Sequence, residues 1–134
     1  MAGNAFDSNI LIYIIADDPS KAERGRFLIA EGGTISVQVL NEIVSVSRRK
    51  LRLEWPIIVA YLKRLKLLLN VVPVDVAVHN RAVALSMRFN LSFYDAAIVA
   101  AALLADCDTL WSEDMHDGLV VDGRLTIRNP FRLS

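Results

Sequence analysis

Short apolar segments alternate along the chain with longer stretches in which apolar residues recur at helical spacing. The apolar segments predict strands, of which the last two are weaker, at residues 5–7, 34–37, 71–74, 109–112, 119–121 and 125–128. The longer stretches predict helices at residues 9–16, 21–31, 39–50, 56–69, 76–89 and 93–105. No repeat or low-complexity tract interrupts this order, which is typical of an α/β domain.

The short connections between these segments predict a mainly parallel sheet with helices on both faces. Local punctuation supports the boundaries, because Gly32 and Gly33 end one helical stretch and Pro56 suits a first helical turn. A length of 134 residues fits one domain with its own hydrophobic core. We therefore expect a single domain over residues 1–134, folded as a three-layer α/β/α sandwich with a central sheet of four to five strands.

Four acidic residues lie against apolar stretches, where a solvated surface charge is not expected: Asp7, Glu42, Asp95 and Asp114. Asp7 and Asp114 end or follow predicted strands, whereas Glu42 and Asp95 lie in the first turns of predicted helices. In open α/β sheets, sites form beyond the carboxyl ends of the strands, at the point where the strand order reverses. The sequence therefore predicts that the four carboxylates meet at one edge of the sheet.

Such a cluster needs compensation for its negative charge. Two carboxylates ~4 Å apart repel each other by ~4 kcal/mol even at an effective dielectric constant of 20. Several such pairs would remove much of a domain's stability of ~5 to 15 kcal/mol. Either some carboxyl groups are protonated or a divalent cation binds them, and oxygen ligands favour Mg²⁺ or Mn²⁺ over zinc. The two histidines, His79 and His116, lack the paired spacing of a zinc site.

Each acidic residue taken alone also has a structural interpretation. Asp7 could be a helix N-cap, and Glu42 could lie at the edge of an amphipathic helix. Asp95 could form a capping box with the serine three residues earlier, and Asp114 and Asp117 could be ordinary turn residues. These interpretations stay open for each residue separately, but the four acids in this order favour a shared cation site.

The composition limits which partners and which cellular compartment suit the protein. Fifteen basic residues balance fifteen acidic ones, so any polyanion must be gripped by a local basic patch. Cys107 is the only cysteine, which excludes a disulfide framework within the chain and fits a reduced cytoplasmic setting. The longest uncharged apolar run, residues 96–105, is far shorter than the ~20 residues that cross a bilayer, and the first residues lack a signal-peptide pattern. We expect a cytoplasmic protein without a membrane span.

Four segments carry the four acids in a fixed order along the chain. The segments are Phe6-Asp7-Ser8-Asn9-Ile10-Leu11-Ile12-Tyr13, Ile35-Ser36-Val37-Gln38-Val39-Leu40-Asn41-Glu42, Ser92-Phe93-Tyr94-Asp95 with the following residues 96–102, and Thr109-Leu110-Trp111-Ser112-Glu113-Asp114-Met115. Together they resemble the PIN-domain nucleases, in particular the VapC toxins of toxin-antitoxin pairs. No single segment is specific. Four segments in this order, over nearly the whole chain, are a strong signal.

The resemblance implies a central parallel sheet and an endoribonuclease that depends on Mg²⁺ or Mn²⁺ and is held inactive by an antitoxin. By motif, Asp7 and Asp95 match the principal metal ligands, and Glu42 and Asp114 match the other two acids of the site. Asp117 is a further candidate ligand. The hydrogen-bonding partners that would orient these carboxylates are Ser8, Asn9 and Ser112.

The residues that bind RNA are less well defined by the sequence. Arg48, Arg49, Lys50 and Arg52 continue the helix that carries Glu42 and are candidates for phosphate contacts. Cations at the carboxyl end of a helix also interact favourably with the helix dipole, so the cluster has an explanation that does not involve RNA binding. The high apolar fraction of 54% suggests that a partner covers part of the surface, so we expect a homodimer and an antitoxin complex.

Other functions must be weighed against this interpretation. A noncatalytic α/β protein-binding module is disfavoured because the acid set is intact, and a PIN-like RNA-processing nuclease that is not a toxin remains an alternative. Phosphotransfer is disfavoured because a phosphatase of the haloacid-dehalogenase type needs a second aspartate where this chain has Asn9. A Ser/His/Asp hydrolase lacks its nucleophile-elbow sequence.

Overall fold

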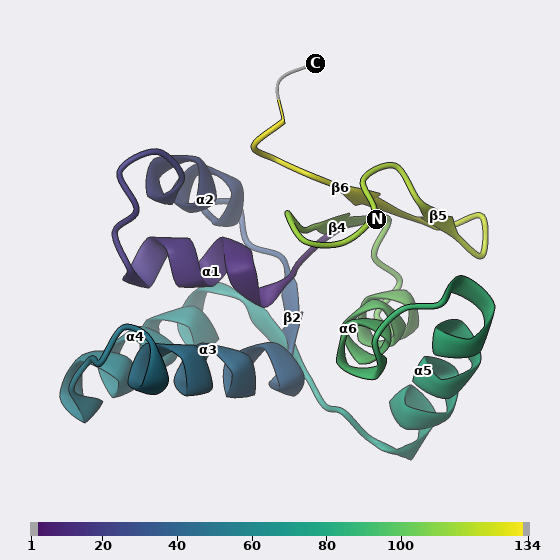
Figure 1. The fold of residues 1–134 in the computed structure, drawn as a ribbon, viewed down its shortest axis with the longest axis horizontal. Helices are drawn as coiled ribbons and strands as arrows, with labels where there is room; N and C mark the ends of the chain where they lie inside the picture. Colours follow the sequence, from purple (N-terminus) through teal and green to yellow (C-terminus); the bar gives the residue numbers. More distant parts are fainter. Residues whose placement is uncertain (1–2, 133–134) are drawn as a thin grey trace.

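The structure, a computed structural model, describes residues 3–132 and has the predicted alternation of strands and helices (Figure 1). The strands are β1 (Asn4–Phe6), β2 (Thr34–Ser36), β3 (Asn70–Val72), β4 (Thr109–Trp111), β5 (Val120–Val121) and β6 (Leu125–Arg128). The helices are α1 (Ser8–Ile15), α2 (Ala22–Ile29), α3 (Val37–Arg49), α4 (Trp55–Leu68), α5 (Val76–Phe89) and α6 (Phe93–Leu104).

All six strands belong to one sheet, in the order β3-β2-β1-β4-β6-β5. Every neighbouring pair is parallel except β5 and β6, which are antiparallel. The prediction of a mainly parallel sheet is confirmed, but the expected four to five strands were too few. Asp122 and Gly123 have positive φ angles of 53° and 66°, and this tight reversal lets the short β5 pair with β6.

Helices flank the sheet on both sides, which confirms the three-layer α/β/α sandwich. Figure 1 shows α1 to α4 grouped on one side and α5 with α6 on the other. Side-chain caps fix where several helices begin, because Ser36 accepts a hydrogen bond from the Val39 amide at 3.4 Å and Asp75 accepts one from the Val78 amide at 3.0 Å. The Ser36 cap explains why α3 begins two residues before its predicted start.

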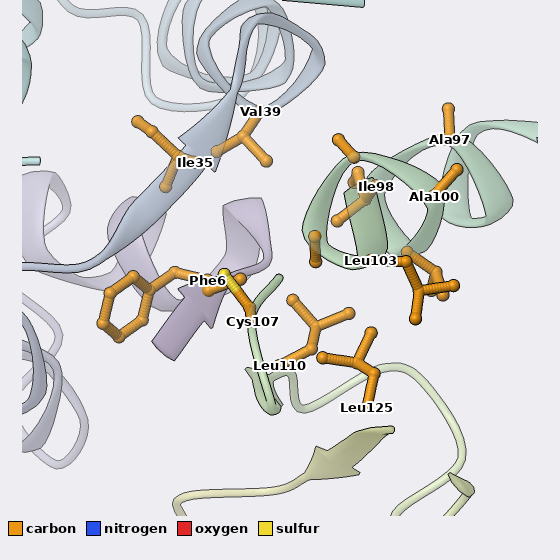
Figure 2. Close-up of a cluster of buried hydrophobic side chains, with 14 of the residues drawn as sticks. Phe6, Ile35, Val39, Ala97, Ile98, Ala100, Leu103, Cys107, Leu110 and Leu125 are labelled. Carbon is orange, nitrogen blue, oxygen red and sulfur yellow. The ribbon is translucent and has the colours of Figure 1, made fainter. Parts of the chain in front are cut away.

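Helix α6 lies at the centre of the hydrophobic core. All residues from Ala96 to Leu103 are buried, and Figure 2 shows Leu103 on the side of this helix toward Leu110 and Leu125 from the sheet. The many alanines allow neighbouring elements to approach closely on several sides of this helix. Within residues 3–132 no single helix is long and apolar enough to span a membrane. Helices α5 and α6 together have the length and the apolar composition of a span, but the chain bends by 118° between them.

Candidate functional site

The strand order places the site between β1 and β4. The chain fills one half of the sheet from β1 to β2 to β3, and then returns through α5 and α6 to place β4 on the other side of β1. The reversal of strand order leaves the carboxyl ends of β1 and β4 as the binding edge. Asp7 directly follows β1, and Asp114 comes shortly after β4.

Asp7 is the most deeply buried acid of the site, with 3% of its surface exposed. Its carboxylate accepts hydrogen bonds from the Ser8 amide at 2.7 Å, from Asn9 Nδ2 at 3.1 Å and from Ser112 Oγ at 2.7 Å. Burial raises the pKa of Asp7 to about 6, the hydrogen bonds from Ser112 and Ser8 oppose the shift, and the other acids add to it. Asp7 is also the N-cap of α1, so both interpretations of this residue apply.

Glu42 faces the start of α1 from the second turn of α3. Ser8 Oγ donates a hydrogen bond to Glu42 Oε1 at 2.6 Å, and Gln38 Nε2 donates one to Oε2 at 3.0 Å. The Gln38 contact was missed by the sequence analysis, although its spacing of four residues along a helix is a recognisable signal. The two contacts orient the Glu42 carboxylate, and the one from Ser8 joins α1 to α3 beside Asp7.

Asn9 links the acids that follow β1 and β4. Its Nδ2 donates to Asp7 Oδ2 and to Asp114 Oδ2, both at 3.1 Å, and its Oδ1 accepts from the Glu113 amide at 3.3 Å. Asp114 itself is exposed. The Asn9 side chain thus joins the loop after β4 to the start of α1.

Asp95 reaches the same edge from the first turn of α6. The Asp95 amide donates to Ser92 Oγ at 3.2 Å, so Ser92 caps the helix and the serine half of the expected capping box is present. Burial is the largest cause that raises the pKa of Asp95, the hydrogen bond with Ser92 lowers it, and the charges of Glu42 and Asp114 raise it further. Hydrogen bonds through Ser8 and Asn9 link Asp7 to Glu42 and to Asp114. The charge of Asp95 raises the pKa of Asp7, which indicates that Asp95 lies near these acids.

The loop after β4 is clamped by Glu113, a residue that the sequence analysis did not assign. Glu113 accepts hydrogen bonds from Tyr13 and, at 2.6 Å, from Lys21, whose ammonium group also lies 4.7 Å from the centre of the Tyr13 ring. Burial tends to raise the pKa of Glu113, but these hydrogen bonds outweigh it and lower the pKa. The clamp positions the neighbouring Asp114.

Asp117, the further candidate ligand, contacts the segment after β6. Its Oδ1 accepts a hydrogen bond from the Asn129 amide at 2.8 Å, and its Oδ2 lies 3.4 Å from Arg132 Nη1. Both carboxylate oxygens are therefore engaged with the segment after β6. These contacts compete with metal binding by Asp117, and its role as a further ligand stays a prediction.

The basic cluster after α3 lies at the far end of that helix from the acids. Arg49 is seven residues beyond Glu42, a rise of about 10 Å along the axis. Arg48 donates to the Leu53 carbonyl at 3.0 Å and lies 4.9 Å above the Trp55 ring, so it stabilises the chain reversal before α4. Arg49, Lys50 and Arg52 are exposed, and RNA contact by them stays a prediction.

The chemistry of the four carboxylates fits a divalent cation. None of the ion pairs formed within residues 3–132 involves any of them, so no lysine or arginine compensates their charge. Their oxygen donors suit Mg²⁺ or Mn²⁺. In the described part of the chain no three acidic, histidine or cysteine side chains are already arranged to hold one ion. The site therefore has carboxylates of a kind that suits such a cation, but in this structure they are not grouped around one ion position.

The fold and the site together define an α/β protein with an acidic cluster at the switch point of a parallel sheet. The model of the PIN domain family matches residues 5–116, a range that includes all four acids. The chain belongs to the PIN domain family. A comparison with curated proteins gave no match.

Several solved structures share this fold at low sequence identity. A toxin-antitoxin complex from Klebsiella pneumoniae contains a chain with 20% identity and a TM-score of 0.74, and the match covers 97% of this chain and 99% of that one. VapC20 from Mycobacterium tuberculosis, a toxin that cleaves the sarcin-ricin loop, has 19% identity and a TM-score of 0.69 over 83% and 89% of the two chains. VapBC2 from Rickettsia felis, bound to a promoter DNA fragment, has 19% identity and a TM-score of 0.63 over 83% and 87%.

Proposed function

We propose that the protein is a metal-dependent endoribonuclease and the toxin of a toxin-antitoxin pair. The observation that carries the proposal is the buried Asp7 carboxylate, which stands among three further acids without any basic partner. Membership of the PIN domain family and the likeness in fold to VapC20 support the same reaction class. A phosphodiester of RNA is the proposed substrate.

The chain's own residues provide the ligands and hold them in place. Asp7 and Asp95 would bind the cation, with Glu42 and Asp114 as the further carboxylates of the site. When bound, a divalent cation lowers the pKa of water and neutralises charge that develops on the phosphate. Ser8 and Ser112 use their hydroxyl groups to orient carboxylates, at 2.6 Å from Glu42 and 2.7 Å from Asp7, which suits hydrolysis by water rather than by a side-chain nucleophile.

Cleavage should require a divalent cation. Purified protein incubated with structured RNA is expected to cut it in Mg²⁺ or Mn²⁺ and to lose cleavage in excess EDTA, because the four carboxylates then repel both one another and the substrate. Activity should return when Mg²⁺ is added in excess over the chelator. Gel analysis of end-labelled RNA measures the effect. Undiminished cleavage in EDTA would contradict the proposed mechanism.

We propose that an antitoxin binds in an apolar cleft between α1, α2 and α4. The cleft has a volume of about 350 Å³ and is lined by Ile14, Ile29, Leu65 and Leu68, among others, with Arg26 and Arg64. Apolar walls with two arginines suit an amphipathic segment that carries acidic side chains. Two of the similar structures are toxin-antitoxin assemblies, which supports this kind of partner. The homodimer expected from the sequence stays a prediction.

Expression of the protein alone should stop bacterial growth if it is a toxin. We expect growth to resume when the product of a neighbouring antitoxin gene is expressed with it, because the antitoxin covers the cleft and blocks the nuclease. Colony counts after induction, with the Asp95→Asn variant as the inactive control, measure the effect. RNA cleavage in vitro without any growth arrest would instead identify an RNA-processing nuclease that is not a toxin.

A further inference from the structure

A second cavity, rich in arginine, lies beside the acidic site. It has a volume of about 270 Å³ and lies between α2, the carboxyl ends of β4 and β6, and the segment after β6. Its walls include Arg24, Arg128 and Arg132, together with Trp111 and the single carboxylate of Asp117. Three guanidinium groups against one carboxylate leave two positive charges uncompensated. A cavity of this size can hold several water-sized groups of ~30 Å³ each.

The arginines are only partly engaged by the protein. Arg24 donates through Nε to the Pro130 carbonyl at 3.2 Å, and Arg132 lies 3.4 Å from Asp117. The side chain of Arg128 is exposed and has no ion pair or side-chain hydrogen bond within residues 3–132. Guanidinium groups offer hydrogen-bond donors in a planar fork that matches the oxygens of a phosphate. The cavity therefore has donors available for an anionic ligand.

Trp111 also lines this cavity. Its indole Nε1 is buried and has no hydrogen-bond partner in the described part of the chain, but an atom without accessible surface is out of reach of a ligand in the cavity. The arginines therefore supply the hydrogen-bond donors that an anionic ligand can contact.

The backbone connects this cavity directly to Asp7. The Trp111 carbonyl accepts a hydrogen bond from the Asp7 amide at 2.9 Å, and the next residue, Ser112, donates to the Asp7 carboxylate. Arg128 lies opposite Trp111 in the register of β4 and β6. Since adjacent strands are ~4.8 Å apart, the end of β6 lies about 10 Å from the end of β1. Both sites face the same edge of the sheet.

We infer that this arginine cavity binds a phosphate of the RNA backbone next to the phosphate that is cleaved. The inference rests on the proposed nuclease function and names a substrate contact for it. A nuclease whose catalytic edge is acidic needs a separate basic surface to hold a polyanion, and single-stranded nucleic acid is held by basic grooves that follow its backbone. The cavity satisfies this need better than the cluster after α3, because it lies at the carboxyl edge whereas that cluster lies at the opposite end of the helix.

The experiment measures RNA binding separately from RNA cleavage. A short single-stranded RNA with a fluorescent label is titrated with protein that carries Asp95→Asn, in Mg²⁺ and at several salt concentrations. In this background Arg128→Gln is expected to weaken binding about tenfold and to reduce the slope of log K against log salt by about 0.7, because one phosphate contact is lost. Arg128→Lys should keep most of the salt slope, since it keeps the charge.

A matched variant removes a charge elsewhere. Arg88 lies at the end of α5 and pairs with Asp122 at 3.4 Å. The control variant Arg88→Gln should leave RNA binding unchanged. RNA binding that is equally strong with and without Arg128→Gln would overturn the inference, even if the wild-type protein cleaves RNA. If Arg128→Gln weakens binding of polyglutamate but leaves RNA binding unchanged, the inference is also overturned. The cavity would then be assigned to an acidic protein segment. Failure of the nuclease proposal has a different signature, namely no cleavage by wild-type protein in Mg²⁺.

Discussion

The Asp7→Asn variant is expected to lose RNA cleavage by at least about a thousandfold, which corresponds to ~4 kcal/mol of transition-state stabilisation. Asp7 is the most buried acid of the site, and three donors converge on its carboxylate from Ser8, Asn9 and Ser112. An asparagine removes the charge and turns an NH₂ group toward some of these donors. Initial rates of cleavage in saturating Mg²⁺ measure the loss.

The same variant should leave the fold intact and change how stability depends on pH. The pKa of Asp7 is about 6 in the folded protein, above its ordinary value of 3.8, so the folded state binds this proton more tightly. The resulting stabilisation is fully present below about pH 4 and is lost as the pH rises through about 6; a shift of roughly two units is worth about 3 kcal/mol. Urea unfolding in EDTA from pH 4 to 7.5 should show this decline in the wild type and a smaller one in Asp7→Asn.

Asp108, at the amino end of β4, provides the control for Asp7→Asn. Asp108 lies just before β4, is exposed and accepts a hydrogen bond from Thr109 Oγ1 at 3.1 Å. Asp108→Asn removes the same charge but should preserve both the cleavage rate and the pH dependence. Wild-type cleavage by Asp7→Asn would disprove the assigned role of Asp7, whereas an unfolded Asp7→Asn protein would show as lost circular dichroism.

Gly33→Ala is expected to destabilise the protein by about 2 to 6 kcal/mol, because backbone strain and overpacking each cost ~1 to 3 kcal/mol. Gly33 has φ of +143°, a conformation that residues with a Cβ rarely adopt. A Cβ at this position would lie 2.5 Å from Phe6 Cε2 and 2.9 Å from the Asn4 carbonyl oxygen. Because Phe6 is fully buried and directly precedes Asp7, the clash would also displace the first acid of the candidate site. Urea or thermal unfolding measures the loss of stability.

Two other glycines separate strain from steric overlap. Gly118 has φ of +90° with open space where a methyl group would lie, so Gly118→Ala should show the strain alone, about 1 kcal/mol. Gly3 has neither a positive φ nor a close neighbour, and Gly3→Ala should have almost no effect. Equal losses for Gly33→Ala and Gly118→Ala would show that Phe6 moves aside without cost.

Local sequence patterns were sufficient for most of the secondary structure. The prediction for α5 matches its observed range, and α6 ends one residue before its predicted end. Residue 74 falls outside β3, which ends at Val72 before Pro73, because proline has no N–H group to continue the ladder. Boundaries were predicted well because periodicity, caps and proline act within a few residues of the position that they define.

The side-chain contacts were beyond the reach of local patterns. Asp117 resembled an extra ligand by its spacing from Asp114, but the fold directs it to Asn129 and Arg132. The arginine cavity had no local signal at all, because Arg24 and Arg128 are more than one hundred residues apart in the chain.

The sequence by itself determined the order of strands and helices, the α/β class, and the position of four acids beside the ends of apolar segments. The tertiary structure decided which of the acidic side chains turn toward one another, how Ser8, Asn9 and Ser112 hold them, and which basic residues lie beside them. The physical reason is one of range. Helix and strand formation depend on neighbours along the chain, whereas a charged cluster depends on where the sheet brings distant segments together and on the direction in which each side chain leaves the backbone.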